Sequence, residues 1–172
     1  MSVSYKHGEG VSECVGLLIS ILLRYPEVGS IHFDPQTHEI RLTFIISGDR
    51  KILQIAEKRQ AILEALQTYH QLEIIKPQLC AVEEKQHDHY SMIDVKRDVD
   101  TLTKDEISLL MELIQIHFPY ALIVDISEEM WAEDIQIQDE MIGHMLEGIK
   151  NGIVDNKLVA YREEGKVLVF NR

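Results

Sequence analysis

The chain has 172 residues, of which 45% are hydrophobic, and its 29 acidic and 17 basic residues give a formal net charge of −12 at pH 7. This length predicts one domain or two small halves that share a core, and the content of four prolines and nine glycines excludes collagen-like and low-complexity architectures. The excess of acidic residues disfavours non-specific binding to nucleic acid unless the few basic side chains gather on one face.

The first elements along the chain are a helix and a hairpin. Apolar residues recur at helical spacing over residues 11–24, and Pro26 ends that helix. Two runs of strand-forming residues, 31–33 and 40–46, flank the turn 34–37, which has a proline at its second position. These residues therefore predict a helix followed by an antiparallel hairpin.

A second helix and a third strand follow the hairpin. Asp49 has the side chain of an N-cap for a helix that runs to about His70 and places Ile52 on its buried face. Residues 72–82 predict a strand, and Pro77 within it indicates an edge strand or a bulge.

The second half of the chain begins with a polar connection at residues 86–89, which is the candidate boundary between the two halves. Residues 90–99 have the composition of a strand. Thr103 and Glu106 form a capping box, in which their side chains exchange hydrogen bonds with the free amides at a helix start. This helix is expected to run to about His117.

The last predicted elements are a buried strand, an acidic helix and a hairpin. Residues 120–126 are almost entirely apolar, which is typical of a strand covered on both faces. Ser127 is expected to cap a long helix with acidic residues in its first turn, and Gly152 ends that helix. Residues 157–161 and 167–170 flank a Glu-Glu-Gly turn and predict a C-terminal hairpin.

The predicted order is helix, strand, strand, helix, strand, and then strand, helix, strand, helix, strand, strand. This mixture predicts an α+β fold, in which about four helices pack on a mostly antiparallel sheet built from hairpins. Residues 1–85 form a near-neutral half and residues 86–172 an acidic half. The two halves are expected either as separate units or as one continuous domain.

The two halves differ in charge. Residues 1–85 contain 11 acidic and 9 basic residues, whereas residues 86–172 contain 18 acidic and 8 basic residues. Surfaces of unequal charge can align the copies of a homo-oligomer or steer a basic partner. The alternative interpretation is that solvated acidic helix faces keep the protein soluble.

A small group of basic residues lies at the start of the second predicted helix. Lys51 and Lys58 are seven residues apart, so they share a face of that helix. Such a group could contact the phosphates of RNA. The candidate binding residues are Arg50, Lys51, Lys58 and Arg59.

Pro26, Val28 and Gly29 lead into the first strand of a helix–strand–strand–helix–strand stretch from Leu17 to Val82. In these features the stretch, less than half of the chain, resembles the KH-like domain of the ribosome-binding factor A family. The resemblance implies an RNA- or ribosome-associated module as an alternative function. KH modules clamp the nucleic-acid backbone with a Gly-x-x-Gly loop, and this chain contains no such loop.

Two pairs of histidines suggest a second alternative, a metal-binding protein. His87 and His89 are two residues apart and would point to the same side of a strand, and His32 and His38 flank the first hairpin turn. Imidazole nitrogens are ligands for zinc and other transition metals. A site made of these four residues requires residues 87–89 to reach the hairpin; otherwise they belong to two polar surface loops.

Common catalytic motifs are missing from the sequence, which contains no Walker motif, HExxH, Gly-x-Ser-x-Gly or EF-hand loop. Glu140, His144 and Glu147 share a helix face, but the paired Glu-x-x-His motifs of di-metal bundles are missing, so a surface pair is expected. Trp131 is expected to pack its helix onto the core or, alternatively, to anchor an interface.

These patterns together predict a cytoplasmic, non-enzymatic protein without a cofactor that acts through protein–protein contact as a homo-oligomer. Nucleic acid is not an expected partner. The longest apolar run, residues 15–23, is too short to span a membrane, so no membrane contact is expected. Cys14 and Cys80 have no CxxC neighbour and are expected to be reduced thiols.

Overall fold

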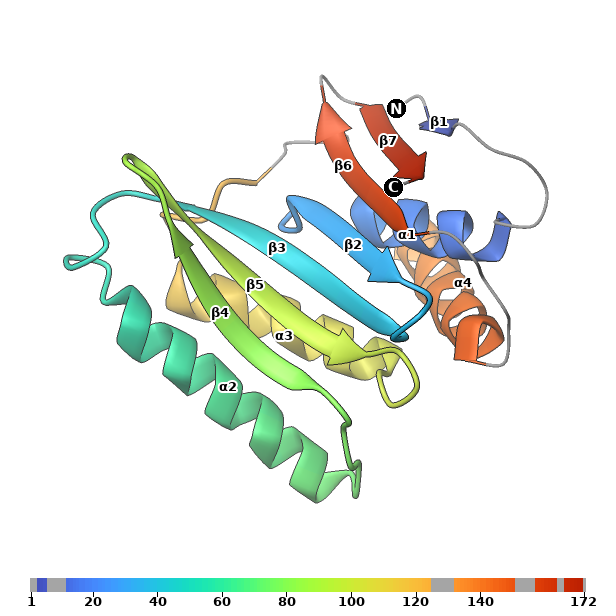
Figure 1. Ribbon diagram of the computed structural model, residues 1–172, viewed down its shortest axis with the longest axis horizontal. Helices are drawn as coiled ribbons and strands as arrows, with labels where there is room; N and C mark the ends of the chain where they lie inside the picture. The colour runs from blue at the N-terminus through green and yellow to red at the C-terminus, as the bar shows by residue number, and fades with distance from the viewer. Residues whose placement is uncertain (1–2, 6–11, 125–131, 151–156, 164–165, 172) are drawn as a thin grey trace.

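Seven strands form one sheet, and four helices pack against one of its faces, in the described part of the computed structural model (Figure 1). The structure describes residues 3–5, 12–124, 132–150, 157–163 and 166–171. The strands are β1 (Val3–Tyr5), β2 (Ser30–Asp34), β3 (Glu39–Ser47), β4 (Cys80–Gln86), β5 (Tyr90–Asp98), β6 (Leu158–Glu163) and β7 (Lys166–Asn171). The helices are α1 (Ser12–Arg24), α2 (Ile55–Leu72), α3 (Lys104–His117) and α4 (Ala132–Lys150).

The strand order in the sheet is β1-β7-β6-β2-β3-β5-β4. Every pairing between neighbours is antiparallel except that of β1 with β7, which is parallel. The prediction of an α+β fold with four helices on a mostly antiparallel sheet is confirmed. Strands from residues 1–85 and from residues 86–172 are intermixed in this sheet, since β3 pairs with β5 and β2 pairs with β6.

The polar segment at residues 86–89 closes a third hairpin. It connects β4 to β5, and the His87 amide donates a hydrogen bond to the Tyr90 carbonyl over 2.9 Å. The candidate boundary between the halves therefore lies at a tight turn between two paired strands.

The strand predicted at residues 72–82 begins later than expected, at Cys80. Helix α2 runs on to Leu72, and Ile74 has a positive φ of 56°, which turns the chain away from the helix. The following loop is held by Asp98, whose Oδ1 accepts hydrogen bonds from the amides of Gln78 and Leu79, both over 3.1 Å.

The start of α2 also differs from the prediction. The Asp49 carboxylate accepts hydrogen bonds from the amides of Lys51 (2.8 Å) and Ile52 (3.1 Å), so it caps a turn and not the helix itself. Gln54 then takes a left-handed conformation, with φ 54°, and the helix begins at Ile55. As a result Ile52 is 81% exposed, and the expectation that it is buried was wrong.

The apolar run predicted as a strand at residues 120–126 pairs with β3 through one antiparallel bridge, between Leu122 and Ile46. Hydrogen bonds of 2.8 Å flank it, from the Ser47 amide to Ala121 and from the Ile123 amide to Ile45. The run lies alongside the last residues of β3, which extend past Ser30, the first residue of β2. Residues 125 and 126 lie outside the described residues, as do Ser127, Trp131 and Gly152.

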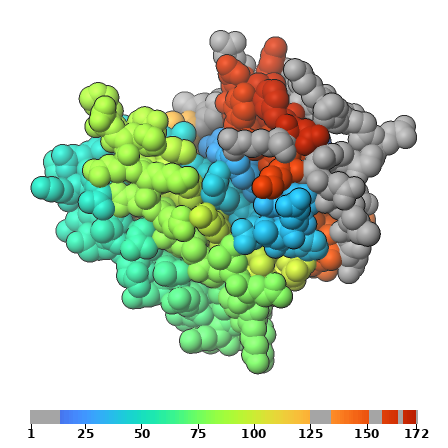
Figure 2. Space-filling model, viewed as in Figure 1, coloured from blue at the N-terminus to red at the C-terminus, as the bar shows by residue number. Residues whose placement is uncertain are grey.

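Alternation along the strands separates two faces of the sheet. Inward residues such as Ile31, Phe44 and Ile93 are fully buried against the helices. The opposite face carries half-buried residues such as Arg41 and Tyr161, and no helix of the described chain covers it. Figure 2 views the molecule from this uncovered side.

Arg162 on β6 connects the C-terminal hairpin to the end of α1 through hydrogen bonds. Its guanidinium donates hydrogen bonds to the carbonyls of Leu22 (2.6 Å), Tyr25 (2.7 Å) and Val28. These contacts supply hydrogen-bond donors to carbonyls at and just after the end of α1, where backbone carbonyls lack partners within the helix. None of the helices in the described chain has the length and hydropathy needed to cross a bilayer.

Candidate functional site

The two arginines of the predicted basic group both make contacts with β4. Arg50 forms a two-point ion pair with Glu84 on β4, in which Nη2 donates to Oε2 over 2.9 Å and Nε donates to Oε1. Arg59 Nη1 donates a hydrogen bond of 2.8 Å to the Val82 carbonyl. Both guanidinium groups therefore hold α2 and the preceding turn against the edge strand β4.

The two lysines of this group have different surroundings. The Lys58 ammonium lies 5.2 Å from the centre of the Phe118 ring, at the end of α3, and forms a cation–π contact. Lys51 is exposed in the turn before α2. Of the four residues, Lys51 is therefore the one whose side chain makes no ion pair, hydrogen bond or ring contact with another described residue.

The four candidate histidines lie on β2 and in two separate turns. His32 is on β2, and His38 follows in the β2–β3 turn, with Nδ1 3.1 Å from Asp100 Oδ1. His87 and His89 are exposed in the β4–β5 turn, where the His87 ring stacks on Tyr90 at 4.6 Å between centres.

The strand register shows that these turns are at opposite ends of the sheet. Glu39, at the start of β3, pairs with Asp98, whereas Ser47, at its end, pairs with Tyr90. Eight residue steps separate the two ends, about 26 Å at the usual strand rise. The structure does not bring the four histidines together, and the described residues contain no group of three or more His, Cys, Asp or Glu side chains suited to a metal ion.

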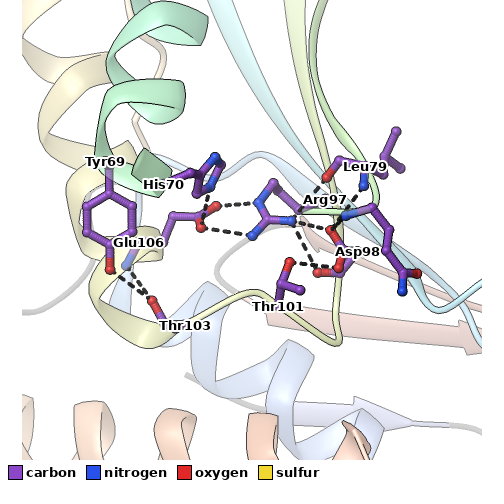
Figure 3. Close-up of polar contacts among 9 residues, drawn as sticks. Tyr69, His70, Leu79, Arg97, Asp98, Thr101, Thr103 and Glu106 are labelled. Atoms are coloured by element: carbon purple, nitrogen blue, oxygen red, sulfur yellow. Dashed lines mark hydrogen bonds and ion pairs between the residues drawn. The ribbon is translucent and has the colours of Figure 1, made fainter. Parts of the chain in front are cut away.

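A buried charged cluster lies between the sheet and two helices (Figure 3). Arg97 on β5 points toward the helices, where its Nε donates to Glu106 Oε2 over 2.5 Å and its Nη2 donates to Oε1 over 2.9 Å. His70 Nε2, from α2, lies 2.8 Å from the same Oε1. The three residues are each 2–3% exposed, so the cluster ties β5, α2 and α3 together away from solvent.

Asp98 completes this cluster at the end of β5. Burial by itself would raise its pKa, but hydrogen bonds from the Thr101 hydroxyl (2.7 Å) and the Leu79 amide, together with the charge of Arg97, hold that pKa below its usual value. The pKa of Arg97 is raised because Glu106 and Asp98 outweigh the effect of its own burial. The cluster is paired and closed to solvent, which is the character of a structural element.

Glu106 shows why the predicted capping box forms only in part. The Thr103 hydroxyl accepts a hydrogen bond of 3.2 Å from the Glu106 amide, as expected for an N-cap. The carboxylate of Glu106, however, points inward to Arg97 and His70 instead of returning to the Thr103 amide. The ion pair with Arg97 therefore replaces one of the two capping bonds.

Cys80 lies beside the same cluster, and both cysteines of the described chain are free thiols. Burial raises the pKa of the Cys80 thiol, and the nearby carboxylates of Glu106 and Asp98 add to this rise, against the lowering effect of Arg97. Cys80 therefore has the properties of an unreactive structural thiol.

The most unusual surface lies at the end of the sheet where β3 ends. Large apolar side chains are exposed there to an extent that is uncommon outside interfaces: Tyr120 is 99%, Ile52 81% and Ile116 71% exposed. We call this surface the apolar end. Its residues are Ile52, Tyr90, Ile116, Tyr120, Ile123 and Val124.

Backbone and side-chain contacts bring the segments that carry these residues to the same end of the sheet. Ser47 pairs with Tyr90 across the sheet and donates its amide to Ala121, next to Tyr120. The turn that holds Ile52 follows directly after Ser47. The contact of Lys58 with Phe118 brings the first turn of α2 to the end of α3, two residues after Ile116.

Sequence reasoning missed the apolar end, although one signal for it was present. The buried stripe of α3 consists of Ile107, Leu110, Met111 and Ile114 at helical spacing. Ile116 is apolar but lies off that stripe, which marks it as a residue that the helix does not bury.

A second exposed surface lies on α4, and we call it the acidic helix face. Ile137 and Met141, one turn apart, are 54% and 44% exposed, and the exposed carboxylates of Asp134 and Glu140 flank them. Asp139 is instead paired with Arg24, over 2.9 Å. The acidic helix face therefore combines apolar and negative groups.

No family model, curated protein or solved structure matches the chain.

Proposed function

We propose that the protein is a non-enzymatic self-assembling protein, in which the apolar end of one copy packs against the acidic helix face of another. The observation that carries this proposal is the exposure of Tyr120, Ile52 and Ile116 in the described chain. Aromatic and aliphatic side chains that fill a partner's surface supply most of the binding energy of protein interfaces.

Charge complementarity selects the second copy as the partner. Lys51 projects next to Ile52 at the apolar end, and Asp134 and Glu140 project next to Ile137 and Met141 on α4. The apolar end thus presents an exposed lysine beside apolar residues, and the acidic helix face presents exposed carboxylates beside apolar residues. Complementary charges of this kind orient two surfaces and accelerate their encounter.

The proposed contact joins two different surfaces of the same chain, so it is heterologous. A contact of this kind closes into a ring when its rotation permits and otherwise extends into a filament. The protein is therefore expected to form assemblies larger than its 19.9 kDa chain, with a mass distribution that depends on concentration.

Light scattering after size exclusion tests this expectation. Tyr120→Ser should weaken assembly by about tenfold or more, since an exposed Tyr buried in an interface is a frequent hot spot. Ile74→Ser is the matched control, because Ile74 is 86% exposed but follows the other end of α2. A wild-type chain that stays monomeric at high concentration, or an equal effect of both variants, would contradict the proposal.

A charge exchange tests the partner surface separately. Lys51→Glu and Glu140→Lys should each weaken assembly several-fold at low salt, because like charges then face each other. The double variant carries both reversed charges and should recover assembly. If the loss of assembly free energy in the double variant equals the sum of the losses in the two single variants, the acidic helix face is not the partner of the apolar end.

A further inference from the structure

A groove of about 260 Å³ crosses the sheet at the β2–β3 turn, at the opposite end of β3 from the apolar end. Phe33, Ile40, Leu158 and Val159 also border the groove. Of these, Val159 has its side chain on the uncovered face of the sheet, whereas the side chains of Phe33, Ile40 and Leu158 are buried on the opposite face, against the helices. The charged and polar lining of the groove consists of His32, Asp34, Glu39, Arg41, Lys96 and Lys157.

Arg41 is the basic residue of the groove for which the described part of the chain supplies no side-chain partner. It lies between His32 and Lys96 in one cross-strand row on the uncovered face of the sheet. Its Nε is buried without a hydrogen-bond partner among the described residues, and none of their ion pairs includes Arg41. A guanidinium donor withdrawn from water without an acceptor costs free energy, which a bound acceptor would recover.

The other cations of the groove already have counter-ions. Lys96 pairs with Glu83 at 2.9 Å, and Lys157 pairs with Asp34 at 3.4 Å. Burial would raise the pKa of Asp34, but the Gln36 amide and Lys157 hold it below its usual value, so this carboxylate stays ionised at neutral pH. Of the three cations that line the groove, Arg41 is therefore the one without an ion pair among the described residues.

We propose that this groove binds a small organic anion, whose oxyanion group pairs with Arg41 and whose apolar part lies against Val159. With His32 neutral, the three basic and two acidic side chains of the lining have a formal charge of +1, which suits an anion. The planar guanidinium matches a carboxylate or a phosphate through two parallel hydrogen bonds. The groove volume is that of a small molecule.

The overall charge of −12 does not prevent this binding. Exposed charges are screened beyond about 8 Å at physiological ionic strength, so the groups that line the groove dominate the local potential. The site is independent of the proposed self-assembly, because its lining residues and those of the apolar end are separated by the length of β3.

Titration with defined probes, followed by amide NMR shifts of groove residues, tests the proposal. Benzoate and phenyl phosphate each combine an oxyanion with an apolar ring, and benzyl alcohol is the neutral comparison. We expect at least one of the two anions to bind in the groove, with benzyl alcohol about tenfold weaker or worse. The preferred anion identifies the oxyanion as carboxylate or phosphate.

Variants of Arg41 connect the binding to this residue. Arg41→Met should weaken anion binding about tenfold or more. Arg41→Lys keeps the charge but loses the planar group that donates two parallel hydrogen bonds, so its affinity should lie between those of Arg41→Met and the wild type. Lys76→Met removes an exposed cation outside the groove and should leave binding unchanged. The titrations are repeated in a Tyr120→Ser chain, so that their outcome does not depend on self-assembly.

The melting temperature of the ligand-free protein is a second readout. A variant with a damaged fold would melt at a lower temperature, whereas the proposal predicts a higher one. Without a ligand, Arg41→Met should melt about 2 °C higher than the wild type, because it removes a buried donor that has no acceptor. Equal binding of anions to the wild type and to Arg41→Met, equal binding of benzyl alcohol, or no shifts with either anion at millimolar concentration would overturn the proposal.

Discussion

Arg97 and Glu106 form a two-point ion pair that joins β5 to the first turn of α3 in the buried layer beneath the sheet. Neither side chain has contact with bulk solvent, and His70 lies against the same carboxylate. Desolvated charges of this kind are stable only together, because removing one leaves the other unpaired in the interior.

Glu106→Gln is therefore expected to destabilise the protein by about 3–5 kcal/mol. Urea unfolding at pH 7, followed by circular dichroism, measures the change. The same substitution at Glu147 is the control, since its carboxylate is 69% exposed in a pair with Lys150 and should matter by less than about 1 kcal/mol. Equal effects of the two substitutions would show that the buried pair is not needed for stability.

The lowered pKa of Asp98 predicts how stability depends on pH. A carboxyl group whose pKa is lower in the folded state stabilises that state above its unfolded pKa, about 3.9, and this contribution is lost as pH falls through the folded pKa. Asp98→Asn should cost about 1–3 kcal/mol at pH 7 and progressively less below pH of about 4.

Unfolding measured at a series of pH values tests this dependence for wild type and Asp98→Asn. The difference in unfolding free energy between the two proteins should narrow toward acid pH. A constant difference from pH 7 to the acid limit would mean that Asp98 acts by its shape and not by its charge.

Thr103→Ala should destabilise the protein by about 1 kcal/mol, because it removes the acceptor of the Glu106 amide at the start of α3. Thr103→Ser keeps the hydroxyl and is the matched control. Both are measured by urea unfolding. If Ser and Ala have the same effect, the loss comes from the methyl group and not from the cap.

Cys80 should react slowly with thiol reagents, because burial and neighbouring carboxylates raise its pKa. In the native protein at pH 7.5, its rate with Ellman's reagent should be lower than that of a small-molecule thiol and should increase toward alkaline pH. Cys80→Ala leaves only Cys14, which is 1% exposed and should not react before unfolding. A fast reaction of Cys80 at neutral pH would contradict the assignment of a structural thiol.

Much of the local structure could be predicted from the order of the residues. Apolar spacing identified α1, most of α2 and α3, and alternation identified the β2–β3 and β6–β7 hairpins. These signals are local, because a helix or a hairpin places residues a few positions apart on one face. The three-residue strand β1 was missed, since its partner β7 lies more than 160 residues further along the chain.

The candidate sites depend on contacts that local patterns do not specify. The row His32, Arg41 and Lys96 arises from the register of three strands, and Ile52 became exposed because a left-handed residue delayed the start of α2. The histidines were grouped by residue type, but the register places their turns at opposite ends of the sheet.

The amino-acid sequence by itself determined the fold class, the helices, the hairpins and the unequal charge of the two halves. The tertiary structure decided which strands are neighbours, which charges are paired and which apolar side chains stay exposed. The physical reason is that burial and ion pairing depend on the distance in space between residues far apart in the chain, whereas helical and strand periodicity depend on near neighbours.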